Sequence, residues 1–245
     1  YVMGSVNLGG NSVINISAPT SLILVSNSVT GTGRIAAIPA TSSIVGNVMV
    51  QRYFPAKRSF RFLSSPIANA TFASWQSAFY ITGNGAGSDA GSTLPTVSYY
   101  NEPNTGNLNQ GYYPISSGMS APITVGSGFR VLVRGDRSLP ISSSTLQFTS
   151  ATLSVTGTIN SGNISIPLVY TSTAGNNLTN DGWNLIGNPY PSQIDWNLRG
   201  ATNNLDNAIY LFDPRSDINT LVGTYFNFVS GVATGSRSSL AERPN

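Results

Sequence analysis

The sequence predicts an all-β protein: an antiparallel β-sandwich, jelly-roll-like, preceded by short β-solenoid or stalk-like strands. Composition is the first reason. Only 9% of the 245 residues are charged, and the chain has one lysine and two glutamates, so long helices with solvated charged faces are not expected. The second reason is a recurrence of short apolar runs between turns rich in Gly, Pro and Asn, which is typical of sandwiches.

The first part of the chain, residues 1–50, is predicted to be the end of a repetitive stalk or solenoid. The apolar runs expected to be strands are residues 6–8, 13–16, 22–25, 34–38 and 44–54. Glycine accepts positive φ and asparagine tolerates it, so the Gly- and Asn-containing segments between these runs favour turns. A spacing of about ten residues fits either sandwich hairpins or coils of a parallel β-solenoid. We expect a stalk that packs into the domain that follows.

The remainder, residues 51–245, is predicted to be a β-sandwich domain with a long loop at 81–96. Alternation in the strand before that loop places Phe60 and Phe62 toward the core and Arg61 on the opposite face. The segment 71–78 is the one predicted helix, expected to cover an end of the sandwich. The glycine-rich stretch that follows it predicts a surface loop.

Further strands are predicted after the loop. They are residues 97–100, 128–134, 146–148, 152–158, 164–168, 183–187, 209–212 and 224–228. In the run 128–134, Phe129, Val131 and Val133 should share one face, with Arg130, Leu132 and Arg134 on the other. Both faces of this strand should therefore be at least partly covered.

Several function classes lose support from composition alone. The chain has no cysteine and no histidine, which removes disulfides, thiolate chemistry and the commonest general base and transition-metal ligand. The net charge of +3 comes with scattered arginines, whereas nucleic-acid binding calls for a dense basic stripe. No apolar run reaches the length of a membrane span, so no membrane insertion is expected. The residues after Tyr1 show no basic segment followed by an apolar one, the pattern of a signal peptide, and both ends are expected to be cuts from a longer protein.

Three stretches resemble large exported surface proteins of Bacteroidetes that leave the cell by type IX secretion. They are GNVMVQRYFPAKRSFRFLSSPI (46–67), GFRVLVRGDRSL (128–139) and GWNLIGNPYPSQIDWN, which ends at Asn197. The resemblance implies an adhesin-like protein with a repetitive β ectodomain, secreted or held at the outer cell surface. Such proteins usually end in a C-terminal sorting domain, which this fragment lacks. The family pattern brings no catalytic residues.

Aromatic side chains are the candidate ligand-binding residues. Tyr99-Tyr100 and Tyr112-Tyr113 flank an expected hairpin, so one ring of each doublet should face out. The rings that could stack on a sugar are Tyr100, Tyr113, Trp183, Tyr190 and Trp196. The alternative for the last three is a structural corner at the rigid Gly-Asn-Pro-Tyr-Pro turn, onto which Trp196 should pack. A strip of arginines could likewise bind acidic glycans or cover apolar surface; its members are Arg52, Arg58, Arg61, Arg130, Arg134 and Arg137.

No catalytic residue is predicted, and the chain is expected not to be an enzyme. A glycosidase needs two carboxylates about 5 to 10 Å apart, and Asp213 with Asp217 is the pair that could supply them. No cofactor is expected except a structural calcium ion, whose oxygen ligands could come from loop residues. The candidate calcium pairs are Asp206 with Asn207, Asp213 with Asp217, and Asn84 with Asp89.

The sequence thus predicts a non-enzymatic structural or adhesive module of an exported bacterial cell-surface protein. Its expected partners are neighbouring domains of the same long chain and a surface glycan. The first alternative is a lectin-like, glycan-binding module. A glycoside hydrolase fragment is the other.

Overall fold

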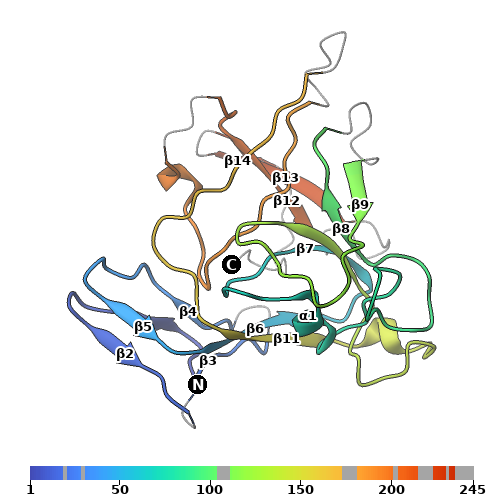
Figure 1. Cartoon of the computed structure of the whole chain (residues 1–245), viewed down its shortest axis with the longest axis horizontal. Helices are drawn as coiled ribbons and strands as arrows, with labels where there is room; N and C mark the ends of the chain where they lie inside the picture. Colours follow the sequence, from blue (N-terminus) through green and yellow to red (C-terminus); the bar gives the residue numbers. More distant parts are fainter. Residues whose placement is uncertain are drawn as a thin grey trace.

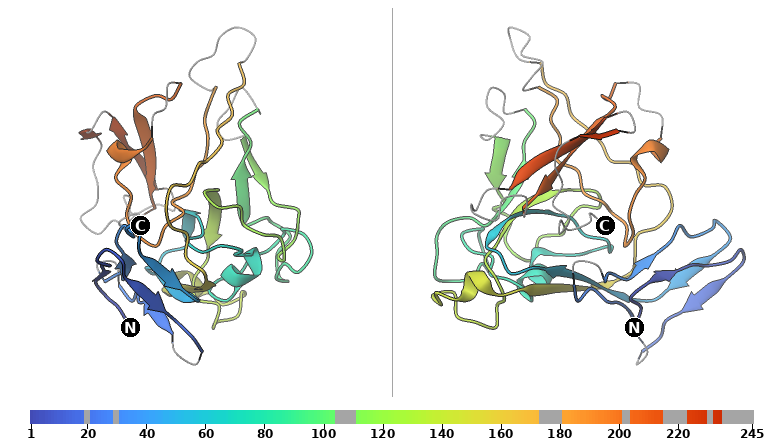
Figure 2. Two further views of the ribbon diagram at one scale, coloured as in Figure 1. Left: turned by 60° about the vertical axis from the view of Figure 1, so that its left-hand side comes forward. Right: turned by 180° about the vertical axis from the view of Figure 1, so that it is seen from behind.

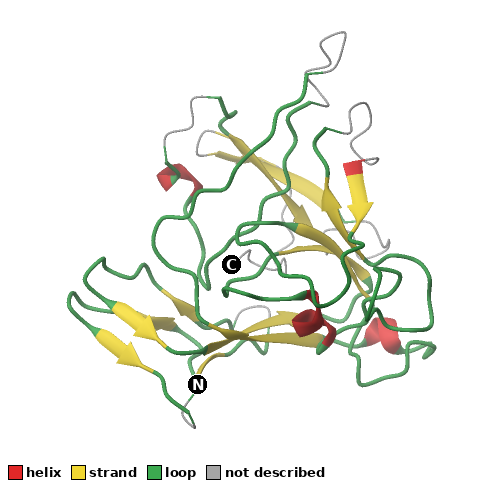
Figure 3. Cartoon of the chain, viewed as in Figure 1, coloured by secondary structure: helices red, strands yellow, loops and turns green. Residues whose placement is uncertain are grey.

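The computed structural model describes residues 1–18, 21–28, 31–103, 111–172, 181–200, 204–214, 223–229 and 232–234. These residues form a mostly β structure built from several sheets, which confirms the predicted fold class (Figures 1 and 3). None of the helices in these ranges is long and apolar enough to cross a membrane.

The N-terminal strands pair in parallel, as the coils of a solenoid do. Three strands, β1 (Ser5–Val6), β2 (Val13–Asn15) and β3 (Leu22–Leu24), pair in order with β4 (Arg34–Ile35), β5 (Ser43–Val45) and β6 (Val48–Phe54). The predicted strand 44–54 is divided between β5 and β6 at Gly46. This glycine has a φ of +104°, and a Cβ there would lie 2.1 Å from the carbonyl oxygen of Ile16. Only glycine fits this corner.

Strand β6 connects the coils to the sandwich. One edge pairs in parallel with β3, and the other pairs in antiparallel fashion with β11 (Ala151–Gly157) over seven residues. The sheet order is therefore β11-β6-β3. The predicted boundary at residue 50 falls inside β6.

Two further antiparallel sheets complete the sandwich. The middle sheet has the order β7-β10-β8-β9, with β7 at Ser59–Leu63, β10 at Phe129–Val133, β8 at Val97–Tyr100 and β9 at Tyr112–Pro114. The other has the order β12-β13-β14, with bounds Ala208–Asp213, Thr224–Val229 and Val232–Thr234. Strand β12 contacts β7, so the middle sheet lies between its two neighbours (Figure 2).

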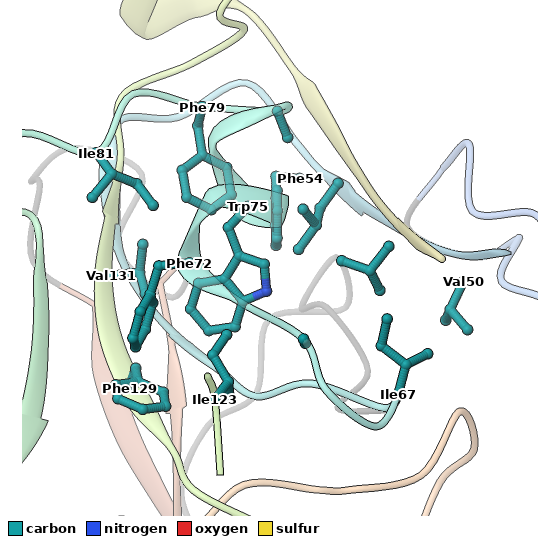
Figure 4. Packing of buried hydrophobic residues seen from close by; sticks show 14 of the residues in the cluster. Val50, Phe54, Ile67, Phe72, Trp75, Phe79, Ile81, Ile123, Phe129 and Val131 are labelled. Atoms are coloured by element: carbon teal, nitrogen blue, oxygen red, sulfur yellow. The ribbon is translucent and has the colours of Figure 1, made fainter. Parts of the chain in front are cut away.

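The hydrophobic core centres on the short helix α1 (Phe72–Gln76). Its Trp75 is fully buried and meets Phe72 and Phe129 edge to face at 5.7 and 5.9 Å between ring centroids (Figure 4). The helix also contacts β11, and Phe79 beyond it packs against Phe54 of β6. The predicted helix is confirmed in type but is shorter than 71–78. Phe72 and Trp75 on one side of the helix are buried in the core between two sheets, whereas Ala73 and Ser77 on the other side are exposed.

The predicted orientation of β7 is also wrong. Arg61 is buried at 2% exposure, whereas Phe60 is 39% exposed. The Arg61 guanidinium lies 5.2 Å from the Phe54 ring centroid and donates a hydrogen bond to the Pro55 carbonyl oxygen at 3.1 Å. The bond pairs one nitrogen of the buried guanidinium group, and the arginine stem packs in the core. Phe62 faces the opposite way, toward aromatic rings of the third sheet.

Three predicted strands are absent. Residues 146–148 form a 3₁₀ turn (Leu146–Phe148), and residues 164–168 and 183–187 have no strand, although Ile186 makes one bridge to Ser127. The other predicted strands beyond the loop are present, β10 with its predicted alternation of buried and half-buried residues.

The loop at 81–96 is present, but its first residues are buried. Asn84, which is one of them, holds the loop in place by hydrogen bonds. The Asn84 amide donates to the carbonyl oxygens of Val97 and Ile115 at 2.7 and 3.1 Å. Its oxygen accepts from the backbone N–H groups of Thr96 and Val97 at 2.9 and 3.0 Å. All four hydrogen-bonding positions of this side chain are used, so the Asn84 side chain holds the loop against the middle sheet by hydrogen bonds.

Candidate functional site

The β8–β9 hairpin sorts the four predicted tyrosines onto two faces. Tyr99 is opposite Tyr113, and Tyr100 is opposite Tyr112. The first pair lies exposed, at 40% and 39%, with ring centroids 6.1 Å apart and planes tilted by 33°. Each doublet thus has one exposed ring, as predicted, but in the first doublet it is Tyr99 rather than the predicted Tyr100. The Tyr99–Tyr113 pair forms a small aromatic surface.

The second tyrosine pair belongs to an aromatic cluster between the middle and third sheets. Tyr112 lies 5.2 Å from Tyr100 and 6.3 Å from Phe62 between ring centroids. Phe62 in turn contacts Phe212 and Tyr225 at 5.5 and 6.1 Å. Burial, together with the nearby Tyr225 hydroxyl, raises the pKa of Tyr112 well above its usual range. Tyr112 is therefore neutral at physiological pH. The aromatic cluster packs the third sheet against the middle sheet.

The Gly-Asn-Pro-Tyr-Pro segment is a structural corner joined to several parts of the fold. The carbonyl oxygen of Asn188 accepts a hydrogen bond from Ser64 at 2.7 Å, and that of Pro189 accepts one from Asn160 at 2.9 Å. The Pro191 carbonyl oxygen accepts from the Ile35 N–H of the coils at 3.0 Å. A Cβ at Gly187 would lie 2.2 Å from Ser64 Cβ, which explains the glycine.

The aromatic residues around this corner pack in separate places. Trp183 meets Tyr210 of β12 at 4.8 Å between ring centroids, and the Tyr190 hydroxyl donates to the Gly162 carbonyl oxygen at 2.6 Å. The Trp196 ring faces the Arg199 guanidinium at 5.1 Å. The five predicted binding residues therefore do not converge on one pocket. Tyr113 is the one whose ring pairs with another exposed aromatic ring.

The oxygen atoms proposed for calcium have structural roles in the loops. Asn84 is fully hydrogen-bonded, and Asp89 accepts from the Ile81 N–H at 2.8 Å and forms a two-pronged ion pair with Arg137 at 2.6 and 2.7 Å. Asp206 is exposed, whereas Asp213 is buried at 3% exposure. Asp217 lies outside the described residues, so neither its calcium pair nor its carboxylate pair with Asp213 can be placed. Within the described ranges, no three His, Cys, Asp or Glu side chains gather as a metal-binding group.

The burial of two charged side chains, Arg61 and Glu102, was not predicted from the sequence. Arg61 lies in the core, as described above. Glu102 is buried and accepts hydrogen bonds from the N–H groups of Thr171 and Gly182 at 2.7 and 2.9 Å. Both side chains bind backbone groups: Glu102 binds those of distant segments, and Arg61 binds those of the turn just before β7. No local sequence signal distinguishes them from solvent-exposed charges.

The Asp89–Arg137 pair predicts a pH-dependent contribution to stability. Burial opposes ionisation of Asp89, but the hydrogen bonds from Arg137 and Ile81 and the charge of Arg137 outweigh it, so the pKa of Asp89 lies below its usual value. A carboxyl group with a lowered folded pKa stabilises the protein above its unfolded pKa and loses that effect as the pH falls. We expect Asp89→Asn to reduce the free energy of unfolding by about 1 to 2 kcal/mol at pH 7, allowing for the partly exposed Arg137.

Urea unfolding at pH 7 and at pH 2.5 measures this difference. The gap between wild type and variant should narrow at the lower pH, because the stabilisation by the ionised Asp89 carboxylate is lost as the pH falls. Asp206→Asn, at an exposed carboxylate, is the matched control and should change little at either pH. An equal loss at both values would contradict the assigned role of the ion pair.

Comparison with known proteins identifies a family but no activity. No curated protein and no solved structure matches the chain. A family model described as a domain of unknown function, DUF8693, matches residues 1–240. Since the match covers nearly the whole chain, the protein belongs to the DUF8693 family.

Proposed function

We propose that the chain is a non-enzymatic structural or adhesive module of an exported bacterial cell-surface protein. The observation that carries this proposal is one continuous hydrophobic core. It runs from Leu24 and Ile44 in the coils, through Phe54 of β6, to Trp75 and Val131 in the sandwich. A core shared in this way suits a module that transmits force or holds a surface at a distance.

The charged groups support the same proposal. Asp89, Glu102 and Arg61 hold backbone segments in place, and in the described residues they do not converge on a common cleft. With 9% charged residues, the surface depends on hydroxyl and amide groups, whose interactions are little affected by salt. Export is supported by the resemblance of three sequence stretches to type IX secreted surface proteins.

Surface exposure on intact cells tests this proposal. Antibodies against this chain should label unpermeabilised cells, and protease treatment of those cells should remove the label. Deletion of the segment that encodes the chain should reduce attachment of the cells to surfaces while the rest of the protein is still exported. Label that appears only after permeabilisation would contradict the proposal.

A glycan-binding module is the second candidate, favoured by the Tyr99–Tyr113 pair. Two exposed rings on neighbouring strands offer flat apolar faces with polar hydroxyl groups, a combination that suits the face of a sugar ring. Tyr113 belongs to the edge strand β9, and Tyr99 belongs to its neighbour β8. If the module is adhesive, as in the first proposal, the Tyr99–Tyr113 pair is the surface through which it would bind.

A glycan array is the test for the tyrosine pair. We expect binding of neutral glycans that weakens at least tenfold in Tyr113→Ala, because the stacking surface is halved. Phe148→Ala, at a ring that is 71% exposed in another part of the surface, should bind as wild type does. Trp196→Ala tests whether the corner around residues 187–191, rather than the hairpin, contributes to glycan binding. If the array is flat for the wild-type protein, or if Phe148→Ala loses binding equally, the hairpin is not a glycan site.

A further inference from the structure

Three arginines share the face of the middle sheet that lies away from the main core. Strands β7 and β10 are neighbours, with Ser59 opposite Val133 and Phe62 opposite Arg130. Arg58 and Arg134 stand one position beyond the Ser59–Val133 pair, and so face one another across the strands. Side chains alternate along a strand, so Arg58, Arg134 and Arg130 project to the same side as Phe60. We call these four residues the arginine face.

The rest of the predicted strip lies elsewhere. Arg61 is buried in the main core, Arg137 pairs with Asp89, and Arg52 belongs to β6 in another sheet. The strip required the two strands to be neighbours, and they are, but Arg61 lies on the opposite face of the sheet from Arg58, Arg130 and Arg134. What remains is a compact group rather than a long strip.

No acidic side chain in the described part of the chain neutralises the arginine face. The Nε atoms of Arg130 and Arg134 are buried and have no hydrogen-bond partner there. Burial, and next the charge of Arg58, lowers the pKa of Arg134. Like charges opposite one another destabilise a sheet, so this arrangement costs stability. An arrangement of this kind is expected where a site serves binding rather than folding.

Aromatic rings fix the third guanidinium. The Arg130 guanidinium carbon lies 3.7 Å from the centroid of the Tyr112 ring and 4.8 Å from that of Phe60. Stacking between two rings restricts the plane of the guanidinium group, which lowers the entropy cost of binding an anion in two-pronged geometry. Phe60, at 39% exposure, remains open to a ligand beside this cation.

We propose that the arginine face binds the carboxylate or sulfate groups of an acidic polysaccharide. Arg130 lies in β10 and Arg134 directly follows its last residue, so the two are four residues apart, roughly 13 Å at about 3.3 Å per residue. This separation fits a ligand with repeated anionic groups better than a single ion. The exposed Phe60 ring supplies a face for the sugar between those groups. Three arginines are few for a nucleic acid, whose affinity rests on many phosphate contacts.

The inference deepens the glycan-binding candidate and rests on it. The ligand class differs, however: the tyrosine pair is expected to take neutral sugars, and the arginine face takes acidic ones. The two surfaces can therefore fail separately. Neutral-glycan binding without acidic-polymer binding would overturn only the present inference, whereas the absence of both would overturn glycan binding as a whole.

Equilibrium binding to polygalacturonate and to heparin, at low and at physiological salt, tests the arginine face. Wild-type protein should bind at least one of these two acidic polymers, and the binding should weaken as the salt concentration rises. The arginine face should not bind neutral dextran. Arg134→Gln should weaken binding at least tenfold. Arg34→Gln removes the same charge from an exposed position in the coils and should change binding less than twofold.

Thermal unfolding of the same variants separates binding from packing. Because Arg134→Gln relieves repulsion with Arg58, its midpoint of unfolding should equal or exceed that of the wild type. A lowered midpoint would show that the arginine is a packing element and would overturn the assignment. So would an equal loss of binding in Arg34→Gln, or equally tight binding of single-stranded DNA, since either result would mean diffuse attraction of any polyanion.

Discussion

The structure depends on the pairing of strand β6 at both of its edges. A strand with one free edge could end the solenoid coils or begin the sandwich, but β6 does both, in parallel with β3 and antiparallel to β11. Its alternate side chains Val48 and Val50 enter a core that the coils and the sandwich share. Disrupting β6 should thus affect both parts, which is the property expected of an extended module.

The middle sheet explains why the candidate surfaces lie where they do. Its inner face packs on α1 and the β11-β6-β3 sheet, so its outer face needs a second cover, which β12 and β13 supply through Phe212 and Tyr225. That cover leaves Phe60 and the opposed Arg58 and Arg134 exposed or half-buried. The tyrosine pair belongs to β8 and β9 of the same sheet and lies on its other face, the face of Val97. Both proposed glycan surfaces are therefore uncovered parts of one sheet.

Local signals in the sequence located most of the strands but not their partners. The alternation of Phe129, Val131 and Val133 marked a real strand, because alternation is a property of a short segment, whereas Gly46 divides a run that was predicted to be one strand. Segment 164–168 shows the same alternation, but it has no partner strand within the described residues. The face of Arg61 was mistaken for a similar reason. Alternation shows that β7 has two faces, but not which of them packs on the main core. Arg61 faces the main core, and the third sheet partly covers the face that carries Phe62.

Native-state hydrogen exchange of β6 tests most directly whether the coils and the sandwich form one cooperative unit. The account predicts that the amides of β6, those of β3 and those of β10 exchange through the same opening, with free energies within about 1 kcal/mol of one another. Exchange of β3 and of the adjoining edge of β6 at a much lower free energy than β10 would contradict it. The coils would then open independently, and the shared core would not be what holds the module together.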